Sequence, residues 1–194
     1  MLEQDVCEEQ RRKYLEVIRK ESMWLADLAS STLLMARLES QNIVGDKKQY
    51  RLDEQIRYCV VLLSELWNEK NISVEGEMPP VMYNGSQEMI RHVWLNLIGN
   101  AIKFTPENGH IYIKAKETDT DILVEIIDDG PGMNEADAKR IFEKYYQADK
   151  SKARQGLGLG LSIVQRIVEL NRGSVTVISS PQKGCIFHVS LPKI

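Results

Sequence analysis

The stretch that most constrains the fold runs from Arg91 to Pro106 and reads RHVWLNLIGNAIKFTP. In a helix each residue turns by about 100°, so the side chains of Asn96, Asn100 and Lys103 project from a narrow arc of one face. Apolar residues gather about a third of a turn away, and they are Ile90, Trp94, Leu97 and Ala101. The sequence therefore predicts a helix that docks its apolar face on a sheet. Its two amides and its ammonium then project together from a different face, towards whatever lies opposite.

The polar side chains of this helix suit a particular chemistry. Amide oxygens suit a hard cation such as magnesium, and a lysine suits phosphate as a point charge. The alternative is a solvated helix face that happens to carry asparagine. Asparagine is a poor helix former, so two of them one turn apart in mid-helix weigh against that alternative. Taken alone, the pattern leaves both interpretations open.

Composition excludes several classes of protein. The chain has 194 residues, of which 43% are hydrophobic and 27% charged, as in a soluble globular domain with one additional element. Its net charge of −3 gives no electrostatic basis for binding nucleic acid. The three cysteines lack the spacing of a metal site, so we expect reduced thiols of a cytosolic protein. No apolar run approaches the roughly 18 residues of a membrane span, and we expect no signal peptide.

Residues Glu8–Ser40 contain no proline or glycine and predict one uninterrupted helix. Its apolar residues step by three or four, close to the seam of a coiled coil, and they are Tyr14, Ile18, Leu25, Leu28, Thr32, Met35 and Leu38. A helix on the order of 45 Å long cannot bury that seam alone, so we expect partner helices. The alternative is a long helix that lies along its own domain. The polar stretch 42–48 is the expected boundary with a globular domain.

Three short elements are expected between this boundary and the asparagine-bearing helix. They are a strand at 50–52, a helix capped by Asp53 that continues to about residue 70, and a strand at 72–75. Ser86 is a good N-cap for the helix that follows.

The second half of the chain predicts two antiparallel hairpins and two further helices. Clean alternation over 110–117 and 121–128 predicts the first hairpin, and 174–179 with 185–191 predicts the second. The helices are expected at 135–145 and 157–170. The predicted fold class is α+β, a two-layer α/β sandwich in which helices cover one face of a mixed sheet, preceded by the long N-terminal helix.

Asp128 ends the first hairpin and begins a glycine-rich turn, DDGPGM at 128–133. Glycines permit close backbone approach and positive φ. A carboxylate at a strand end can accept a hydrogen bond from an exocyclic amine. The alternative is an ordinary strand–helix turn, in which Asp and Gly are common.

A second glycine run, Gly156–Gly160, opens a predicted helix. Backbone amides freed by glycine, together with a helix N-terminus, form a site for an anion. The run lacks the ending of a P-loop and does not follow the pattern of a dinucleotide-binding unit. The preceding segment, 144–155, has the composition of a lid that closes over phosphates, and also that of an ordinary solvated loop. Its basic residues oppose only one acidic residue and are Lys144, Lys150, Lys152 and Arg154.

In this order the motifs resemble the catalytic ATP-binding domain of bacterial sensor histidine kinases, of the Bergerat or GHKL type. NLIGNAIKFTP resembles the asparagine box, DDGPGM the first glycine box, IFEKYYQAD the phenylalanine box, GLGLGLSIV the second glycine box and QKGCIFHVSLP the closing hairpin. The resemblance runs from about Glu9 to Ile194. It implies that residues 1–41 are the second helix of a dimerisation and phosphotransfer hairpin, and that 42–194 are the ATP-binding domain.

The resemblance also implies ATP and Mg²⁺ as ligands. Asn100 would hold magnesium through its side-chain oxygen, Asn96 would support the phosphates or the metal, and Lys103 would reach the phosphates. Phe104 would flank the nucleotide, and Asp128 would accept from the adenine amino group. Related ATPases carry a glutamate that activates water where this chain has Asn96. An amide cannot act as a general base, which favours transfer of the γ-phosphate to another acceptor.

The glycine and aromatic residues receive roles by the same resemblance. Gly130 and Gly132 would shape the pocket floor, and Phe142 and Tyr145 would anchor the lid. The second glycine box would open its amides onto the triphosphate with Gly156, Leu157, Gly158, Leu159 and Gly160.

The chain departs from the family pattern at three positions in this part. Ser86 stands where the family often has Asp, Gln147 where it often has Arg, and Cys185 where it often has Ser or Thr. We expect altered detail at the lid and the pocket rim, with binding retained.

A larger departure concerns the phosphoacceptor. The family carries its acceptor histidine on the first hairpin helix, in a motif resembling His-Glu-Leu-Arg-Thr-Pro. The histidines here are His92, His110 and His188, and none is followed by that motif. We therefore assign no catalytic acceptor residue in this chain and expect a fragment.

The implied function is transfer of the ATP γ-phosphate to a histidine on a helix outside this chain, in a phosphorelay to a response regulator. The implied partners are that acceptor-helix domain, a response regulator and a second copy of the full-length protein, without nucleic acid. The implied location is the cytoplasmic part of a membrane-anchored sensor. Two other classes remain: a nucleotide-binding regulatory module that never transfers phosphate, and an ATPase or anti-sigma-type serine kinase. The long helix favours the sensor kinase over the latter.

Overall fold

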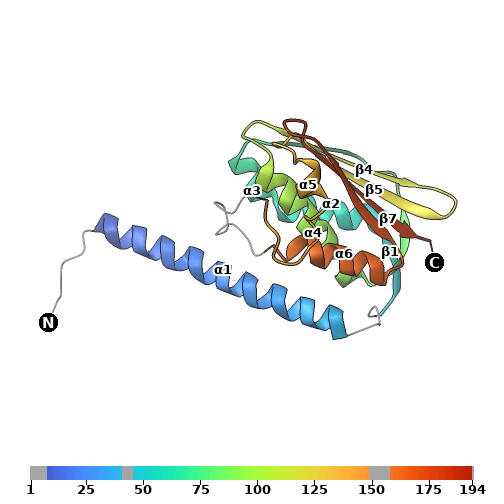
Figure 1. The fold of residues 1–194 in the computed structure, drawn as a ribbon, viewed down its shortest axis with the longest axis horizontal. Helices are drawn as coiled ribbons and strands as arrows, with labels where there is room; N and C mark the ends of the chain where they lie inside the picture. Colours follow the sequence, from blue (N-terminus) through green and yellow to red (C-terminus); the bar gives the residue numbers. More distant parts are fainter. Residues whose placement is uncertain (1–7, 41–45, 149–157, 194) are drawn as a thin grey trace.

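The computed structural model describes residues 8–40, 46–148 and 158–193, and shows a long helix lying against a two-layer domain (Figure 1). The described helices are α1 (Glu8–Ser40), α2 (Leu52–Leu62), α3 (Ser64–Glu69), α4 (Gln87–Phe104), α5 (Glu135–Ala138) and α6 (Gly160–Leu170). The described strands are β1 (Lys48–Arg51), β2 (Ser73–Glu77), β3 (Met82–Gly85), β4 (His110–Glu117), β5 (Asp121–Asp128), β6 (Ser174–Ser179) and β7 (Cys185–Pro192).

The main sheet is mixed and has five strands in the order β2-β4-β5-β7-β6. Strand β2 is parallel to β4, and the other pairs are antiparallel. One face of the sheet is covered by α4 and α6, with α2 packed beside α4 (Figure 1). The alternation of buried and half-buried residues along β5 follows from this one-sided cover. The predicted fold class and both predicted hairpins are therefore confirmed.

The core is centred on α4, whose apolar face is fully buried. Trp94 is completely buried, and its indole N–H donates to Gln55 Oε1 of α2 at 3.1 Å. The amide of Gln55 in turn donates to the carbonyl of Gln87 at 2.6 Å. Ser86 accepts from the backbone N–H of Met89 at 3.5 Å, which confirms it as the N-cap. A buried polar pair with satisfied partners therefore fixes how α2 lies against α4.

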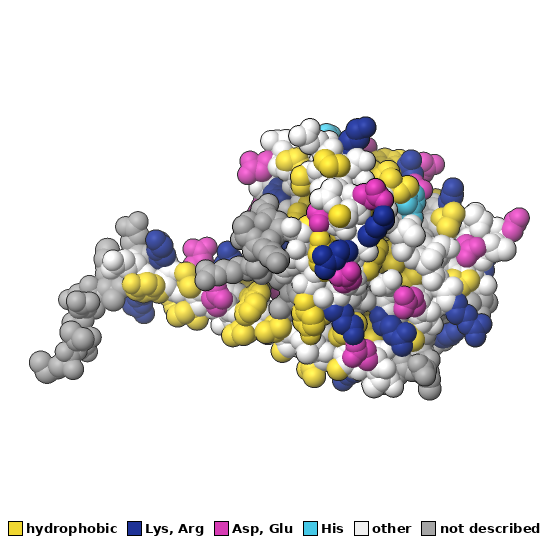
Figure 2. Space-filling model, viewed as in Figure 1, with side chains coloured by type: hydrophobic (Ala, Val, Ile, Leu, Met, Phe, Trp, Pro, Cys, Tyr) yellow, Lys and Arg dark blue, Asp and Glu magenta, His cyan; other side chains and the backbone are white. Residues whose placement is uncertain are grey.

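The long helix α1 has the predicted bounds but buries only one end of its seam. Tyr14, Ile18 and Leu25 are 55–61% exposed, whereas Met35 and Leu38 are buried against α6. Figure 2 shows the exposed hydrophobic side chains along the part of α1 that extends away from the domain. The C-terminal part of α1 therefore lies along its own domain, and the N-terminal part has no partner in the described chain. No helix in the described ranges is long and apolar enough for a membrane span.

The prediction for Asp53 is wrong, because α2 begins one residue before it. The N-cap is Arg51, which makes no side-chain cap. The Asp53 side chain is fully buried; it accepts from Arg51 at 2.6 and 2.8 Å and from the backbone N–H of Val81 at 3.0 Å. The predicted helix to residue 70 is also divided into α2 and α3 at Leu63, where ψ is 12°. The carboxylate thus joins β1 and the start of β3, which sequence spacing does not show.

One further helix end and one short strand also differ from the prediction. The helix expected at 135–145 ends at Ala138 and continues as turns. Strand β3 was not predicted; it is only four residues long and pairs with β1 in a separate two-stranded sheet. Short elements of this kind carry too few residues for a clear periodicity.

We expect Asp53→Asn to lower the free energy of unfolding at pH 7 by about 1–3 kcal/mol, because Arg51 loses a charged acceptor and a buried group is mis-paired. The hydrogen bonds from Arg51 lower the pKa of Asp53 to about 2. This contribution is therefore present above about pH 4 and is lost as the pH falls towards 2. Urea unfolding of both proteins between pH 2 and 7 measures the difference. Glu54→Gln, at an exposed neighbour, is the matched control and should cost much less.

Candidate functional site

On the polar arc of α4, Asn96 lies against the start of α6. Asn96 Nδ2 donates to the carbonyl of His92 at 2.8 Å, which fixes the orientation of the amide. Its Oδ1 would lie 2.5 Å from a Cβ added at Gly160, so any larger residue at that helix start would displace the Asn96 amide. The side chains of Asn96, Asn100 and Lys103 are all half-buried. Within the described ranges the Asn100 amide makes no hydrogen bond, and its oxygen is available to a ligand.

Asp128 is the buried charge of the site. It is 5% exposed at the end of β5, and the backbone N–H of Gly130 donates to its Oδ1 at 2.9 Å. Burial raises the pKa of Asp128 to about 6, against the opposing hydrogen bonds from the Gly130 and Cys185 backbones. A Cβ at Gly130 would lie 2.7 Å from that oxygen and 3.2 Å from the Phe104 carbonyl. The Asp128 turn and the C-terminal end of α4 are therefore in direct contact.

The turn between β6 and β7 holds the Asp128 turn from the other side. Gly132 and Gly184 have φ of 66° and 69°, and an added Cβ would collide with Ser180 O and Asp128 O respectively. Gln182 N donates to Pro131 O at 2.7 Å. The structure thus gives Gly132 a packing role against this turn. Whether it also shapes a pocket floor stays a prediction.

The phenylalanine-box segment meets the second glycine box at Tyr145 and Gly158. The Tyr145 N–H donates to Gly158 O at 2.9 Å, and both residues have positive φ, 63° and 67°. A Cβ at Gly158 would lie 2.7 Å from the Tyr145 carbonyl carbon, so glycine is required there. Leu159 is 1% exposed, and its side chain belongs to the core, which leaves its backbone alone for a ligand. Gly156, Leu157 and the basic Lys150, Lys152 and Arg154 lie outside the described residues.

The aromatic side chains of this segment point in different directions. Tyr145 is 67% exposed. Tyr146, which sequence reasoning missed, donates from its hydroxyl to Asp137 at 2.7 Å and lies under the guanidinium of Arg140 at 4.3 Å. Phe142 is half-buried and packs against the core. Tyr146 is therefore the aromatic residue that holds this segment by polar contacts.

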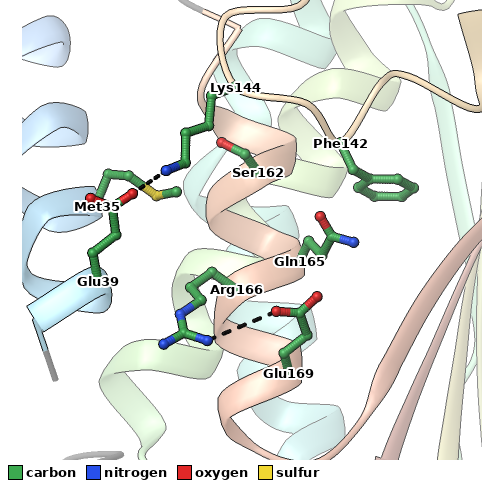
Figure 3. A pocket seen from close by; sticks show the side chains of 8 residues that line it. All are labelled: Met35, Glu39, Phe142, Lys144, Ser162, Gln165, Arg166 and Glu169. Atoms are coloured by element: carbon green, nitrogen blue, oxygen red, sulfur yellow. Dashed lines mark hydrogen bonds and ion pairs between the residues drawn. The ribbon is translucent and has the colours of Figure 1, made fainter. Parts of the chain in front are cut away.

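A cavity of about 300 Å³ lies between α1 and α6, and Phe142 lines one side of it (Figure 3). Lys144 reaches across from its loop to form an ion pair with Glu39 of α1. The lining residues are Met35, Glu39, Phe142, Lys144, Ser162, Gln165, Arg166 and Glu169. None of the asparagines of α4 and no part of the Asp128 turn lines this cavity. Among the predicted nucleotide-site residues in the described ranges, Phe142 alone lines this cavity.

The C-terminal end of α4 contains a residue that the sequence did not mark. Thr105 is the C-cap, is 1% exposed, and its hydroxyl has no partner within the described chain. Beside it Phe104 is 45% exposed, with the Lys103 ammonium 5.0 Å from its ring centroid. A buried hydroxyl usually has a partner, and Thr105 directly follows the predicted site residues Lys103 and Phe104. In the sequence, the only indication of this C-cap was the position of Thr105 between Phe104 and Pro106, at the end of the asparagine box.

The donor set fits magnesium bound together with a nucleotide. The described residues contain no group of three His, Cys, Asp or Glu side chains able to hold a metal. Magnesium in nucleotide sites commonly takes one or two protein oxygens and completes its octahedron with phosphate and water. The Asn100 amide oxygen can supply such a ligand. The remaining ligands would come from the nucleotide.

Residues 85–194 match the family model described as histidine kinase-, DNA gyrase B- and HSP90-like ATPase. The match covers every predicted site residue from Asn96 to Gly160. The sensor histidine kinase TmoS of Ectopseudomonas mendocina is 32% identical over 184 residues, which are 93% of this chain and 19% of that protein. The chain thus spans about a fifth of this relative.

Solved structures agree with the fold as well. The crystal structure of full-length ShkA in complex with AMPPNP has 29% sequence identity and a TM-score of 0.83, over 97% of this chain and 40% of that one. The histidine kinase ThkA in complex with the response regulator protein TrrA has 25% identity and a TM-score of 0.79, over 100% of this chain and 53% of that one. Both alignments include the long helix as well as the two-layer domain.

The burial of Asp128 predicts that Asp128→Asn stabilises the nucleotide-free protein at pH 7. Because the folded pKa is about 6, the ionised carboxylate costs stability as the pH rises from about 4 through 6, and the amide removes that cost. We expect a gain of about 1–3 kcal/mol at pH 7 and little difference near pH 4. Urea unfolding at both values measures it, with Asp119→Asn, at an exposed position in the turn between β4 and β5, as the control. An equal loss of stability at both pH values would contradict this account.

Proposed function

Because this chain belongs to the family of histidine kinase-, DNA gyrase B- and HSP90-like ATPases, we propose that it is the ATP-binding catalytic part of a sensor histidine kinase. The observation that carries the proposal is the buried Asp128 carboxylate, placed in contact with the end of α4. A buried acceptor of this kind is costly unless a ligand donates to it. The adenine amino group supplies that donor, whereas guanine presents a carbonyl there and should bind poorly.

The phosphates are proposed to lie between α4 and the N-terminus of α6. Asn96 Oδ1 lies beside Gly160 at this helix start, and Gly158 precedes it by two residues. Lys103, half-buried on the same helix as Asn96, would reach the phosphates. A helix N-terminus with glycine at its start favours an anion. Bound Mg²⁺ would neutralise part of the phosphate charge, and Asn100 would be its protein ligand.

The proposed reaction moves the γ-phosphoryl group from ATP to an imidazole nitrogen of a histidine on another helix. The bond between the γ-phosphorus and the β–γ bridging oxygen breaks, a phosphorus–nitrogen bond forms, and ADP leaves. Asn96 occupies the position where a base would activate water, and an amide cannot accept that proton. The described site therefore favours the imidazole over water as acceptor.

The exposed half of α1 supports the proposed partners. Residues 1–41 would be the second helix of a dimerisation hairpin, and residues 42–194 the ATP-binding domain. The exposed Tyr14, Ile18 and Leu25 offer an apolar face to the acceptor helix and to a second copy of the protein. The ThkA complex with TrrA supports a response regulator as the next partner. We further propose that the full-length protein is a membrane-anchored sensor with this part in the cytoplasm.

Binding of ATP with and without magnesium tests the two central residues. We expect Asp128→Asn to weaken ATP binding by about 1–3 kcal/mol under both conditions, because a mis-paired buried polar group costs that much. Asn100→Ala should keep the magnesium-free affinity and lose most of the gain that magnesium gives to wild type. Isothermal titration calorimetry measures both. Asn84→Ala, at an exposed position of β3, is the matched control; equal affinities for wild type and Asp128→Asn would remove Asp128 from the adenine site.

Phosphate transfer is tested with γ-labelled ATP. The chain alone should bind Mg–ATP, acquire no label and hydrolyse ATP very slowly. Adding the parent protein's acceptor-helix domain in trans should allow weak transfer, because the covalent link that raises effective concentration is absent. The label should be acid-labile, as phosphohistidine is. Stoichiometric acid-labile label on the chain alone would contradict the proposal and direct attention to His92, His110 and His188.

A further inference from the structure

The ammonium of Lys70 is surrounded by three backbone carbonyls at the C-terminal end of α4. Its Nζ donates to Ile102 O at 2.8 Å, Lys103 O at 2.9 Å and Thr105 O at 2.8 Å. An ammonium has three N–H donors, and all three of those of Lys70 are used by carbonyls at the end of α4. Lys70 is the C-cap residue of α3 and precedes Ile102 by 32 residues. The contact therefore joins two elements that are far apart in the sequence.

The end of α4 needs such a donor. The last carbonyls of a helix have no partner within it, and they form the negative end of the helix dipole. The Thr105 N–H still donates to Ala101 O at 2.9 Å, but Pro106 follows and has no N–H to offer. A positive charge at this position supplies the missing donors and complements the dipole.

The backbone around Lys70 is held against the turn that follows α4. The Asn108 N–H donates to Lys70 O at 2.9 Å, and Asn71 Nδ2 donates to Asn108 Oδ1 at 2.6 Å. The Ser73 N–H donates to Gly109 O at 2.9 Å. Asn71 and Asn108 have φ of 51° and 59°, a region that asparagine tolerates better than most residues. These contacts fix the base of the Lys70 side chain, so the ammonium is directed at one place.

The capped turn also carries predicted nucleotide ligands. Asn100 and Lys103 lie in the last turns of α4, and the Phe104 carbonyl touches the Asp128 turn at Gly130. If these turns frayed, the amide, the ammonium and the floor beside Asp128 would all lose their relative positions. A displacement of about 1 Å of groups that position a ligand is enough to weaken their contacts with it.

We propose that Lys70 is a positioning residue for nucleotide binding: by capping α4 it holds Asn100, Lys103 and Phe104 in the arrangement that Mg–ATP requires. The inference rests on the proposed function, since it names what positions that site. The competing account is that Lys70 contributes to overall stability and has no effect on binding by the folded protein. The two accounts differ in what a folded Lys70 variant binds.

The test compares Lys70→Met, Lys70→Arg and wild type, with Lys193→Met as the matched control. Lys193 pairs with Glu117 at 2.6 Å and takes no part in the α4 cap. Hydrogen exchange of residues 100–105 is measured without nucleotide, and Mg–ATP affinity is measured by calorimetry well below the unfolding temperature. In Lys70→Met we expect faster exchange in this segment and affinity reduced about tenfold. Lys70→Arg should restore both, because a guanidinium can also donate to carbonyls, and Lys193→Met should change neither.

Three outcomes would overturn the proposal, each in a recognisable way. Faster exchange with unchanged affinity would show a cap that does not position the site. Unchanged exchange in Lys70→Met would show that the ammonium does not hold the turn. Failure of wild type to bind ATP would refute the proposed function and the positioning role together, whereas the exchange data would still report on the cap. If Lys70→Met does not fold, Lys70→Gln, which keeps a donor, replaces it in the same comparison.

Discussion

Burial of one face of α4 is the constraint on which the rest of the structure depends. Ile90, Trp94, Leu97 and Ile98 are completely buried between the sheet and the neighbouring helices, and each such side chain contributes about 1.5–3 kcal/mol. With that face committed, the rotation of α4 about its axis is fixed. Asn96 then lies against the start of α6, and the Phe104 carbonyl lies beside the Asp128 turn. The same packing that stabilises the fold thus orients the residues proposed to bind nucleotide.

The Asp128 turn shows how stability and the proposed function oppose each other. Burial raises the pKa of the Asp128 carboxyl, so its ionised form destabilises the folded protein near neutral pH. Three glycines surround it because α4 and the β6–β7 turn approach so closely that a Cβ would collide. Such close approach excludes water from the carboxylate. A hydrogen bond that a ligand donates to Asp128 is therefore stronger than the same bond in water. The arrangement is costly for an empty domain and suited to one that holds adenine.

Helix α1 is in contact with the segment that borders the proposed phosphate region. Lys144 pairs with Glu39 of α1, while the next residue, Tyr145, bonds the backbone of Gly158. On the other side Arg166 of α6 donates to the Leu38 carbonyl at 3.1 Å. The docked end of α1 and the second glycine box therefore contact two adjacent residues, Lys144 and Tyr145 respectively. Helix α6 is in contact with both α1 and the glycine box as well. The exposed end of α1 remains available to the partner helices that its seam predicts.

The sequence by itself determined the elements whose signal is local. Helix α1, strands β4 and β5 and the cap at Ser86 were predicted at their observed places, because periodicity and capping depend on residues a few positions apart. The motifs also predicted a set of residues for one nucleotide site, and that assignment stays a prediction. Tertiary structure alone decided the burial of Asp53, the end of α5 at Ala138, the pairing of β3 and the contact of Lys70 with α4. Each of these depends on a partner far along the chain, and the free energy of such a contact cannot be read from local spacing.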